Sequence, residues 1–254
     1  MKLHYRTQGD GEPVIIIHGL FGDGLNWGGV SRILKDHFRL ILPDMRNHGR
    51  SPHNNDIRYT TMAADIAALM DDLNLPKAHI VGHSMGGKIA MTFALQHPER
   101  VSSLTVVDIA PKRYPIRHRD VFAGLLAVVE AKPQTRQDAE AILQEHIQTT
   151  DVRTFILKNL ERTDQGFQWR INWQALYGHY EDLADFPVES GKYTGPTQFL
   201  VGELSDYVSK EDQPTITGLF PNAKGRIVGG TGHWLHAEKP ELVAEWIRKF
   251  ILAV

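Results

Sequence analysis

The sequence predicts an α/β fold in which a mostly parallel central sheet is flanked by helices and carries an inserted helical cap. Short apolar runs rich in Val, Ile and Leu alternate with amphipathic segments along most of the chain. Near-continuous apolar strands are typical of a parallel sheet covered on both faces. Strand–helix alternation with right-handed crossovers gives a doubly wound arrangement. One long central stretch breaks the alternation and indicates an insertion.

The elements of the expected core follow in order from the N-terminus. Residues 2–8 are expected to form an edge strand, and a turn at Asp10-Gly11 leads into the first apolar strand. Helical spacing of apolar residues predicts a helix over 60–74. Pro240 at a helix-start position predicts the last helix over 240–252. The buried strands are expected at Val14–Ile17, Phe38–Leu42, Ala78–Val81, Leu104–Ile109, Gln198–Val201 and Arg226–Val228.

The stretch from about Lys112 to Pro187 shows no convincing buried strand. Because it lies between two core strands, we expect residues 1–111 and 188–254 to form the core and residues 112–187 to form a helical cap (lid) domain over the site. Helices are expected at 118–131, 135–148, 151–161 and 173–184, and a short extended piece at 166–171 separates the last two. Candidate pocket-lining residues in the cap are Trp169, Trp173, Leu176, Tyr177 and Tyr180.

The composition excludes several classes of function. The net charge of −2 gives no global attraction to nucleic acid or to anionic membranes. The chain has no cysteine, which excludes disulfides, thiolate catalysis and cysteine-based metal sites. Its first residues lack the apolar core of a signal peptide, and no run approaches a membrane span. A cytoplasmic protein without nucleic-acid or membrane partners is therefore expected.

Ser84 is the candidate nucleophile. It stands in Gly82-His83-Ser84-Met85-Gly86, directly after the run Ala78–Val81 and before a helical stretch. Strand, tight turn and helix is the context of a nucleophile elbow, where bulk at either glycine would collide with the neighbouring strand and helix. The serine is expected in a sparsely populated backbone conformation with its Oγ above the sheet edge.

A serine hydroxyl needs a base to accept its proton, and His233 is the candidate. It follows the last expected strand and precedes the last helix, so it should lie above the same sheet edge as Ser84. His83 is expected to pack or to form a hydrogen bond instead. No third ligand is spaced to join His233 and His236, so no metal is expected. No phosphate-binding glycine loop occurs, so no nucleotide cofactor is expected either.

Two aspartates could orient His233 and stabilise its imidazolium form. Asp108 ends the strand that begins at Leu104, whereas Asp206 follows the next strand. In most hydrolases with the chain order Ser, acid, His, the acid comes after that later strand as Gly-x-x-Asp. Here Ser205 takes the fourth position and the aspartate falls one place late. Because a one-residue shift re-aims a side chain, Asp108 is favoured and Asp206 is the alternative acid.

Hydrolysis also needs donors for the tetrahedral oxyanion. The backbone N–H of Met85, next to the nucleophile, is expected to supply one. The loop His18-Gly19-Leu20-Phe21-Gly22 leaves an expected strand at the same edge and supplies the other, from Leu20 in preference to Phe21. The segment Asp44–Ser51 is expected to brace the site through hydrogen bonds.

Together these motifs resemble the α/β-hydrolase superfamily over almost the whole chain, and within it the bacterial YbfF-type esterases. The blocks that carry the likeness are His18–Gly22, Arg46–Gly49, Gly82–Lys88, Asp108–Pro111 and Gly232–Pro240. The resemblance implies a two-domain esterase with a helical cap, acting on short acyl esters, with acyl-CoA thioesters as a further substrate class. It also implies that the acid comes from the strand that bears Asp108.

The motifs therefore predict a serine carboxylic-ester hydrolase that acts on a small-molecule acyl ester or thioester through an acyl-enzyme. The basic run Lys112–Arg119, near the expected mouth of the site, is expected to attract anionic substrates such as CoA thioesters. Two alternatives share the fold: a C–C bond hydrolase of diketone-type substrates with the same triad, and a non-catalytic ligand-binding receptor. The sequence leaves acyl chain length and oligomeric state open.

Overall fold

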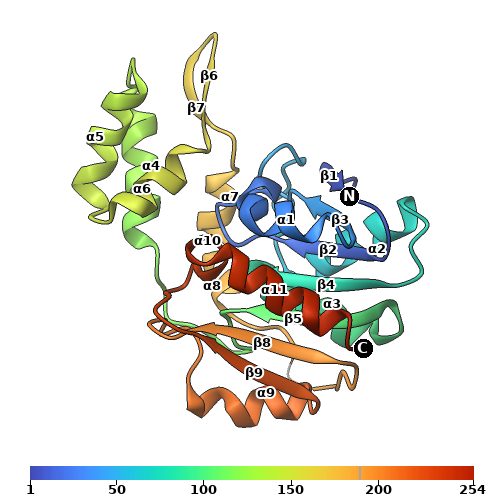
Figure 1. Ribbon diagram of the computed structural model, residues 1–254. Helices are drawn as coiled ribbons and strands as arrows, with labels where there is room; N and C mark the ends of the chain where they lie inside the picture. The colour runs from blue at the N-terminus through green and yellow to red at the C-terminus, as the bar shows by residue number, and fades with distance from the viewer. Residues whose placement is uncertain (189) are drawn as a thin grey trace.

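A seven-stranded sheet forms the centre of the molecule, in the order β1-β3-β2-β4-β5-β8-β9 (Figure 1). The computed structural model describes residues 1–188 and 190–254. β1 pairs antiparallel with β3, and the other neighbouring strands of the sheet pair in parallel. This confirms the predicted fold class. The strands are β1 (Tyr5–Gln8), β2 (Pro13–Ile17), β3 (Arg39–Pro43), β4 (Ala78–His83), β5 (Val101–Val107), β8 (Thr197–Gly202) and β9 (Ala223–Val228).

Helices cover both faces of the sheet. α1 (Gly28–Leu34) and α11 (Pro240–Ile251) pack on one face, and α2 (Tyr59–Asp72), α3 (Met85–Gln96) and α9 (Gln213–Leu219) pack on the other. Within the described ranges, no helix is long and apolar enough to cross a bilayer. The short elements are η1 (Gly24–Trp27), η2 (Pro98–Arg100), η3 (Lys210–Asp212) and α10 (Leu235–Glu238).

The two-sided burial explains why the core strands read as unbroken apolar runs. Successive side chains of a strand point to opposite faces. In β2, Val14 and Ile16 pack into the cluster under α1 and α11, whereas Ile15 and Ile17 pack into the cluster under α2 and α3. All four side chains are completely buried, so an apolar residue is favoured at each position of this strand.

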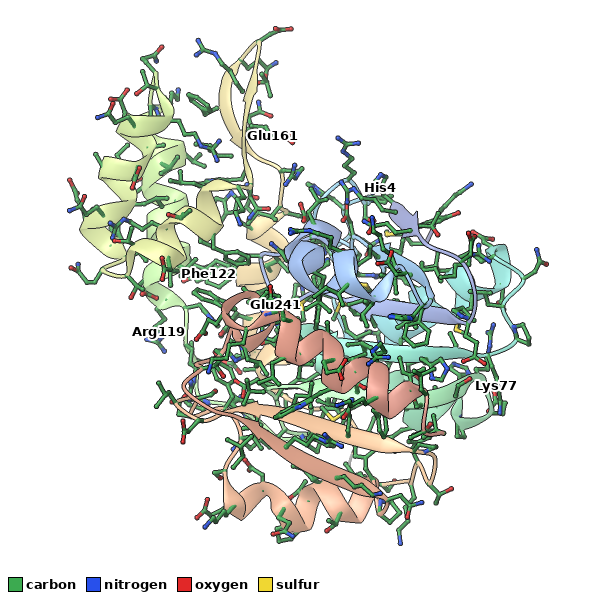
Figure 2. The ribbon with its side chains drawn as sticks, viewed as in Figure 1. His4, Lys77, Arg119, Phe122, Glu161 and Glu241 are labelled. Carbon is green, nitrogen blue, oxygen red and sulfur yellow. The ribbon has the colours of Figure 1, made fainter. Side chains whose placement is uncertain are left out.

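Between β5 and β8 the chain leaves the sheet. Helices α4 to α6 and the hairpin β6–β7 project from one end of the core, whereas α7 and α8 lie against it (Figure 1). Figure 2 shows Phe122 where α4 meets the core and Glu161 on the hairpin, away from the sheet. The elements are α4 (Arg119–Ala131), α5 (Arg136–His146), α6 (Thr150–Leu157), β6 (Leu160–Thr163), β7 (Gly166–Trp169), α7 (Trp173–Gly178) and α8 (Tyr180–Ala184).

Two parts of this insertion differ from the expectation. The helix expected over 151–161 ends at Leu157, and β6 pairs antiparallel with β7 through a turn in which Gly166 has a φ of 103°. Only glycine adopts that conformation without strain, so it favours a hairpin. The helix expected over 173–184 is broken into α7 and α8 after Gly178, a poor residue for a helix interior.

Candidate active site

Ser84 occupies a strained turn between β4 and α3. Its backbone has φ 53° and ψ −118°, a conformation that non-glycine residues rarely adopt. A Cβ at Gly82 would lie 2.1 Å from the carbonyl oxygen of Gly86, and a Cβ at Gly86 would lie 2.4 Å from that of Ile17. The two glycines therefore allow the turn, and the hydrogen bond from the Ser84 N–H to the Val107 carbonyl (3.0 Å) helps to hold it.

Asp108 and His233 form a partly buried hydrogen-bonded pair. Nδ1 of His233 lies 2.7 Å from Oδ2 of Asp108, whose side chain is completely buried. The carboxylate also accepts hydrogen bonds from the Gly202 N–H (2.9 Å) and from the Ser205 hydroxyl. With Nδ1 donating to Asp108, Nε2 of His233 is left as the proton acceptor of the ring.

Ser84 and His233 line one cavity of about 400 Å³. No hydrogen bond joins the two side chains among the described residues. Catalytic hydrogen bonds of this kind commonly tighten only when substrate is bound. His83 points elsewhere: its Nε2 donates to the backbone carbonyl of His233 (2.8 Å), so it supports the loop that carries the imidazole.

Asp206 is committed to a different partner. Its carboxylate accepts two hydrogen bonds from the Arg117 guanidinium, at 2.8 and 3.0 Å, and its side chain is 75% exposed. The hydrogen bonds from Arg117 lower the pKa of the Asp206 carboxyl. His233 is thus bonded to Asp108 and not to the alternative aspartate.

A backbone loop faces the nucleophile from the end of β2. The Phe21 N–H donates to Nε2 of His48 (3.1 Å), so it is not free to bind an oxyanion. Leu20 lines the cavity beside Ser84. Of the backbone donors expected to bind the oxyanion, the N–H groups of Leu20 and of Met85, the first residue of α3, therefore remain.

Buried neutral histidines support this loop from behind. His18 donates from Nδ1 to the Gly19 carbonyl (2.8 Å) and accepts at Nε2 from the Met45 N–H (2.9 Å). Burial lowers the pKa of His18 and lowers that of His48 to about 3. Asp44 adds bonds to the N–H groups of Gly24 and Arg50, both at 2.9 Å, as expected of a bracing segment.

These histidines predict that the protein loses stability in mild acid. Burial lowers the pKa of His48 to about 3, of His236 to about 3 and of His118 to about 4, whereas an unfolded histidine titrates near 6.5. Between those values the unfolded state binds more protons than the native state. The free energy of unfolding should therefore fall below about pH 6.5, by up to ~1.4 kcal/mol per pH unit for each histidine. Urea unfolding between pH 7.5 and 5 measures this.

Single variants identify which histidine causes the unfolding free energy to depend on pH. His48→Gln should make the dependence of unfolding free energy on pH shallower, although it weakens the fold at pH 7.5 as well. His37 is exposed, so His37→Gln should leave the slope as it is. An unchanged slope in His48→Gln would contradict the assignment of acid lability to this histidine.

Much of the basic run at the mouth of the site is paired with carboxylates, which weakens the basis for the expectation that it attracts anionic substrates. Lys112, Arg113 and Arg117 each have an acidic partner, whereas no ion pair of Arg119 occurs among the described residues. The pairs are Lys112–Asp212 (2.7 Å), Arg113–Asp185 (3.2 Å) and Arg117–Asp206 (2.8 Å). Distant charges offset in this way exert little pull on an approaching anion.

Two cavities flank Ser84 and share Leu20, His118 and Tyr207 as wall residues. The smaller has a volume of about 50 Å³, and the larger, which includes His233, about 400 Å³. The smaller is lined mainly by Tyr59, Met85, Ile109, Tyr114, Tyr180 and Leu183. The insertion contributes Val121, Val152, Phe155 and Ile156 to the larger.

Of the cap residues expected to line the pocket, only Tyr180 does so beside Ser84. Trp173 and Tyr177 line a separate outer groove. Trp169 and Leu176 are buried in the packing of the insertion, where the Trp169 indole donates to a backbone carbonyl of α4.

Lys88 is a site residue that sequence reasoning missed. It lies one helical turn after Ser84, is 2% exposed, and donates to the carbonyls of Ala184 (2.8 Å) and Asp185 (2.7 Å). Burial lowers the pKa of its amine to about 7. It fastens the end of α8 to α3, so the wall of the smaller cavity is tied to the nucleophile's own helix.

Comparison with known proteins agrees with this architecture. The chain matches the family model described as alpha/beta hydrolase fold over residues 12–240. It is 36% identical over 257 residues to the Escherichia coli protein named esterase YbfF, covering 99% of both chains. It is 39% identical over 242 residues to the sn-1-specific diacylglycerol lipase ABHD11 of Danio rerio, covering 92% of this chain and 76% of that protein.

A solved structure supports the same relationship. The structure named marine microorganism esterase matches with a TM-score of 0.95 at 39% identity, covering 98% of this chain and 99% of that chain. The similarity therefore extends over the sheet and the insertion alike. These findings confirm the expected likeness to YbfF-type esterases and the expectation of a hydrolytic enzyme. The chain belongs to the α/β-hydrolase family and is an esterase of the YbfF type.

Proposed function

We propose that this esterase is a serine carboxylic-ester hydrolase that works through an acyl-enzyme. Ser84 attacks the ester carbonyl, and Nε2 of His233 takes the hydroxyl proton and delivers it to the leaving alcohol. Asp108 holds the ring in that tautomer. The observation that carries this proposal is the 2.7 Å bond between Asp108 and His233, in a cavity wall shared with a serine on a strained elbow.

The oxyanion is assigned to two backbone donors. As the carbonyl carbon becomes tetrahedral, negative charge develops on its oxygen, and fixed N–H groups at Leu20 and Met85 stabilise that charge. The Met85 N–H also lies at the N-terminus of α3, and the positive end of the helix dipole there favours an anion. A water molecule, activated by His233 in the same way, then releases the acid and restores Ser84.

The two cavities suggest which part of the ester goes where. His233 must reach the leaving oxygen, so the alcohol occupies the larger cavity and the acyl group the smaller one. A volume of about 50 Å³ suits a short acyl chain. The Danio rerio relative is named for diacylglycerol, but the small acyl cavity here favours shorter acids.

The larger cavity favours an uncharged alcohol over coenzyme A. Apolar side chains of the insertion, among them Val121, Phe155 and Ile156, form much of its wall. No lysine or arginine is among the described residues that line this cavity, and three cations of the basic run are paired with carboxylates, so a polyphosphate leaving group gains little there. On this proposal residues 112–187 act as a cap domain on a core of residues 1–111 and 188–254. Residue 189 lies outside the described residues. Cytoplasmic location stays a prediction.

A substrate panel tests this function. With p-nitrophenyl esters from acetate to decanoate, kcat/KM should be highest for the shortest acids and lower by at least about tenfold for decanoate. Acyl-CoAs of matched chain length should be poorer substrates than the esters. A fluorophosphonate probe should label one serine, and mass spectrometry should place the adduct on the peptide that contains Ser84.

The alternatives give different results. A receptor that had lost turnover would bind ligand and remain unlabelled by the probe. A C–C bond hydrolase would be labelled and would cleave a diketone faster than any ester in the panel. Either result would overturn the proposal.

A further inference from the structure

An aromatic ring covers one face of the His233 imidazole. The Tyr207 ring stacks on it with a centroid separation of 3.7 Å and an interplanar angle of 12°. Tyr207 lies just after β8, on the loop from which most related hydrolases take their acid. In this chain Asp108, which follows β5, binds His233, and the loop after β8 places the Tyr207 ring against the imidazole instead.

Several hydrogen bonds hold Tyr207 in this place. Its backbone carbonyl accepts from the Tyr114 hydroxyl (2.6 Å), and its N–H donates to the Ser205 hydroxyl oxygen (3.3 Å). The Ser205 hydroxyl in turn donates to Asp108. The Asp108 carboxylate therefore holds His233 directly through Nδ1. It also holds Tyr207 indirectly, because Ser205 links the Tyr207 backbone to Asp108.

A guanidinium covers the opposite face of Tyr207. The Arg117 Cζ lies 4.6 Å from the ring centroid. A cation on one face of a ring weakens the attraction of that ring for a second cation on the other face. Asp206 holds Arg117 through two hydrogen bonds, at 2.8 and 3.0 Å, and so offsets its charge. Burial raises the pKa of the Tyr207 phenol, so the ring stays neutral.

The charged and titratable groups around His233 come from five parts of the chain. Tyr207 stacks on the imidazole, and among the described residues Asp108 is the only one whose side chain forms a hydrogen bond with it. His83 and His236 approach from β4 and α10 and are kept neutral by burial, and His118 at the start of α4 is likewise neutral. The groups are Asp108, Tyr207 with Arg117 and Asp206, His83, His236, His118, and Glu238, whose carboxylate accepts from the Gly232 N–H at 3.1 Å.

We propose that Tyr207 is a positioning residue for the proposed base: its ring fixes the plane of the His233 imidazole and stabilises the imidazolium that forms during turnover. The Arg117–Asp206 pair adjusts this effect from the far side of the ring. The inference rests on the proposed role of His233. A face-on aromatic attracts a cation through its quadrupole, so the ring favours the protonated state that Asp108 also favours.

Two variants of Tyr207 separate the ring from its hydroxyl. Tyr207→Leu removes the aromatic face, whereas Tyr207→Phe keeps it. In Tyr207→Leu the acid limb of the kcat/KM profile, which reports the free enzyme, should move to lower pH by about half a unit. kcat at the plateau should fall several-fold. Tyr207→Phe should keep the position of the parent's limb and most of kcat.

NMR gives a readout that does not need turnover. The His233 ring protons, assigned by their loss in His233→Gln, should be shifted upfield by the stacked ring in the parent and in Tyr207→Phe. In Tyr207→Leu that shift should vanish and the titration midpoint of His233 should fall. If turnover is absent but these NMR changes occur, the proposed function fails and the stack remains.

The opposite results overturn the inference. If Tyr207→Leu leaves both the acid limb and the His233 titration where they are in the parent, the ring has no electrostatic role. If Tyr207→Phe shifts them as far as leucine does, the hydroxyl is responsible. Asp206→Asn supplies an independent check, because an unbalanced Arg117 should also move the acid limb to lower pH; an unmoved limb would remove the second half of the proposal.

Discussion

Replacing Ser84 with alanine is expected to reduce kcat for ester hydrolysis by about 10⁵- to 10⁶-fold. Without the hydroxyl no acyl-enzyme forms, and the remaining rate comes from binding and the oxyanion donors alone. KM should stay within a few-fold of the parent's, since the cavity walls are unchanged. Steady-state kinetics and fluorophosphonate labelling measure both consequences.

A control serine makes this result specific. Ser102 lies in β5 near the end of the strand opposite to Asp108, so Ser102→Ala should keep the parent's activity and its labelling. A Ser84→Ala protein that retains more than about a hundredth of the parent's kcat would exclude a serine acyl-enzyme at this position.

Asp108→Asn is the second large effect that we expect, a loss of about 10⁴-fold in kcat. The amide that replaces the carboxylate cannot hold His233 in the productive tautomer or stabilise its imidazolium. Asp108 also accepts bonds from Gly202 and Ser205, so the thermal unfolding midpoint should fall as well. Circular dichroism at the assay temperature must therefore show a folded protein before the kinetics are interpreted.

Asp206→Asn distinguishes the two candidate acids. Because this carboxylate binds Arg117 and not His233, its removal should lower kcat by less than about tenfold. Near-parental turnover in Asp108→Asn together with an inactive Asp206→Asn would reverse the assignment.

The sheet could be predicted from sequence because its strands are buried on two sides. Such strands are apolar at most positions, as Val14–Ile17 are, and this leaves a nearly unbroken signal in a single sequence. The hairpin β6–β7 leaves no such signal, because most of its residues are exposed and need no alternation. The extended piece expected over 166–171 contains β7, but its partner β6 could not be distinguished from the end of the helix expected over 151–161.

The site could be predicted as far as its residues belong to local motifs. Ser84 and His233 each lie near glycines at the end of a strand, and around Ser84 the turn geometry requires glycine at 82 and 86. Tyr207 and Lys88 depend instead on contacts between distant segments, 207 with 233 and 88 with 184. A tyrosine on a loop and a lysine in an apolar helix have no spacing that would reveal those contacts.

The positive φ at Ser84 lowers the stability of the fold at the residue that the proposed reaction needs. A side chain in such a conformation costs about 1–3 kcal/mol, which is a substantial fraction of the net stability of an ordinary domain. Glycine would accept the same φ of 53° without that strain, so on the proposed mechanism Ser84→Gly would relieve the strain and remove the nucleophile together. Selection for a more robust enzyme of this type must therefore act elsewhere in the chain.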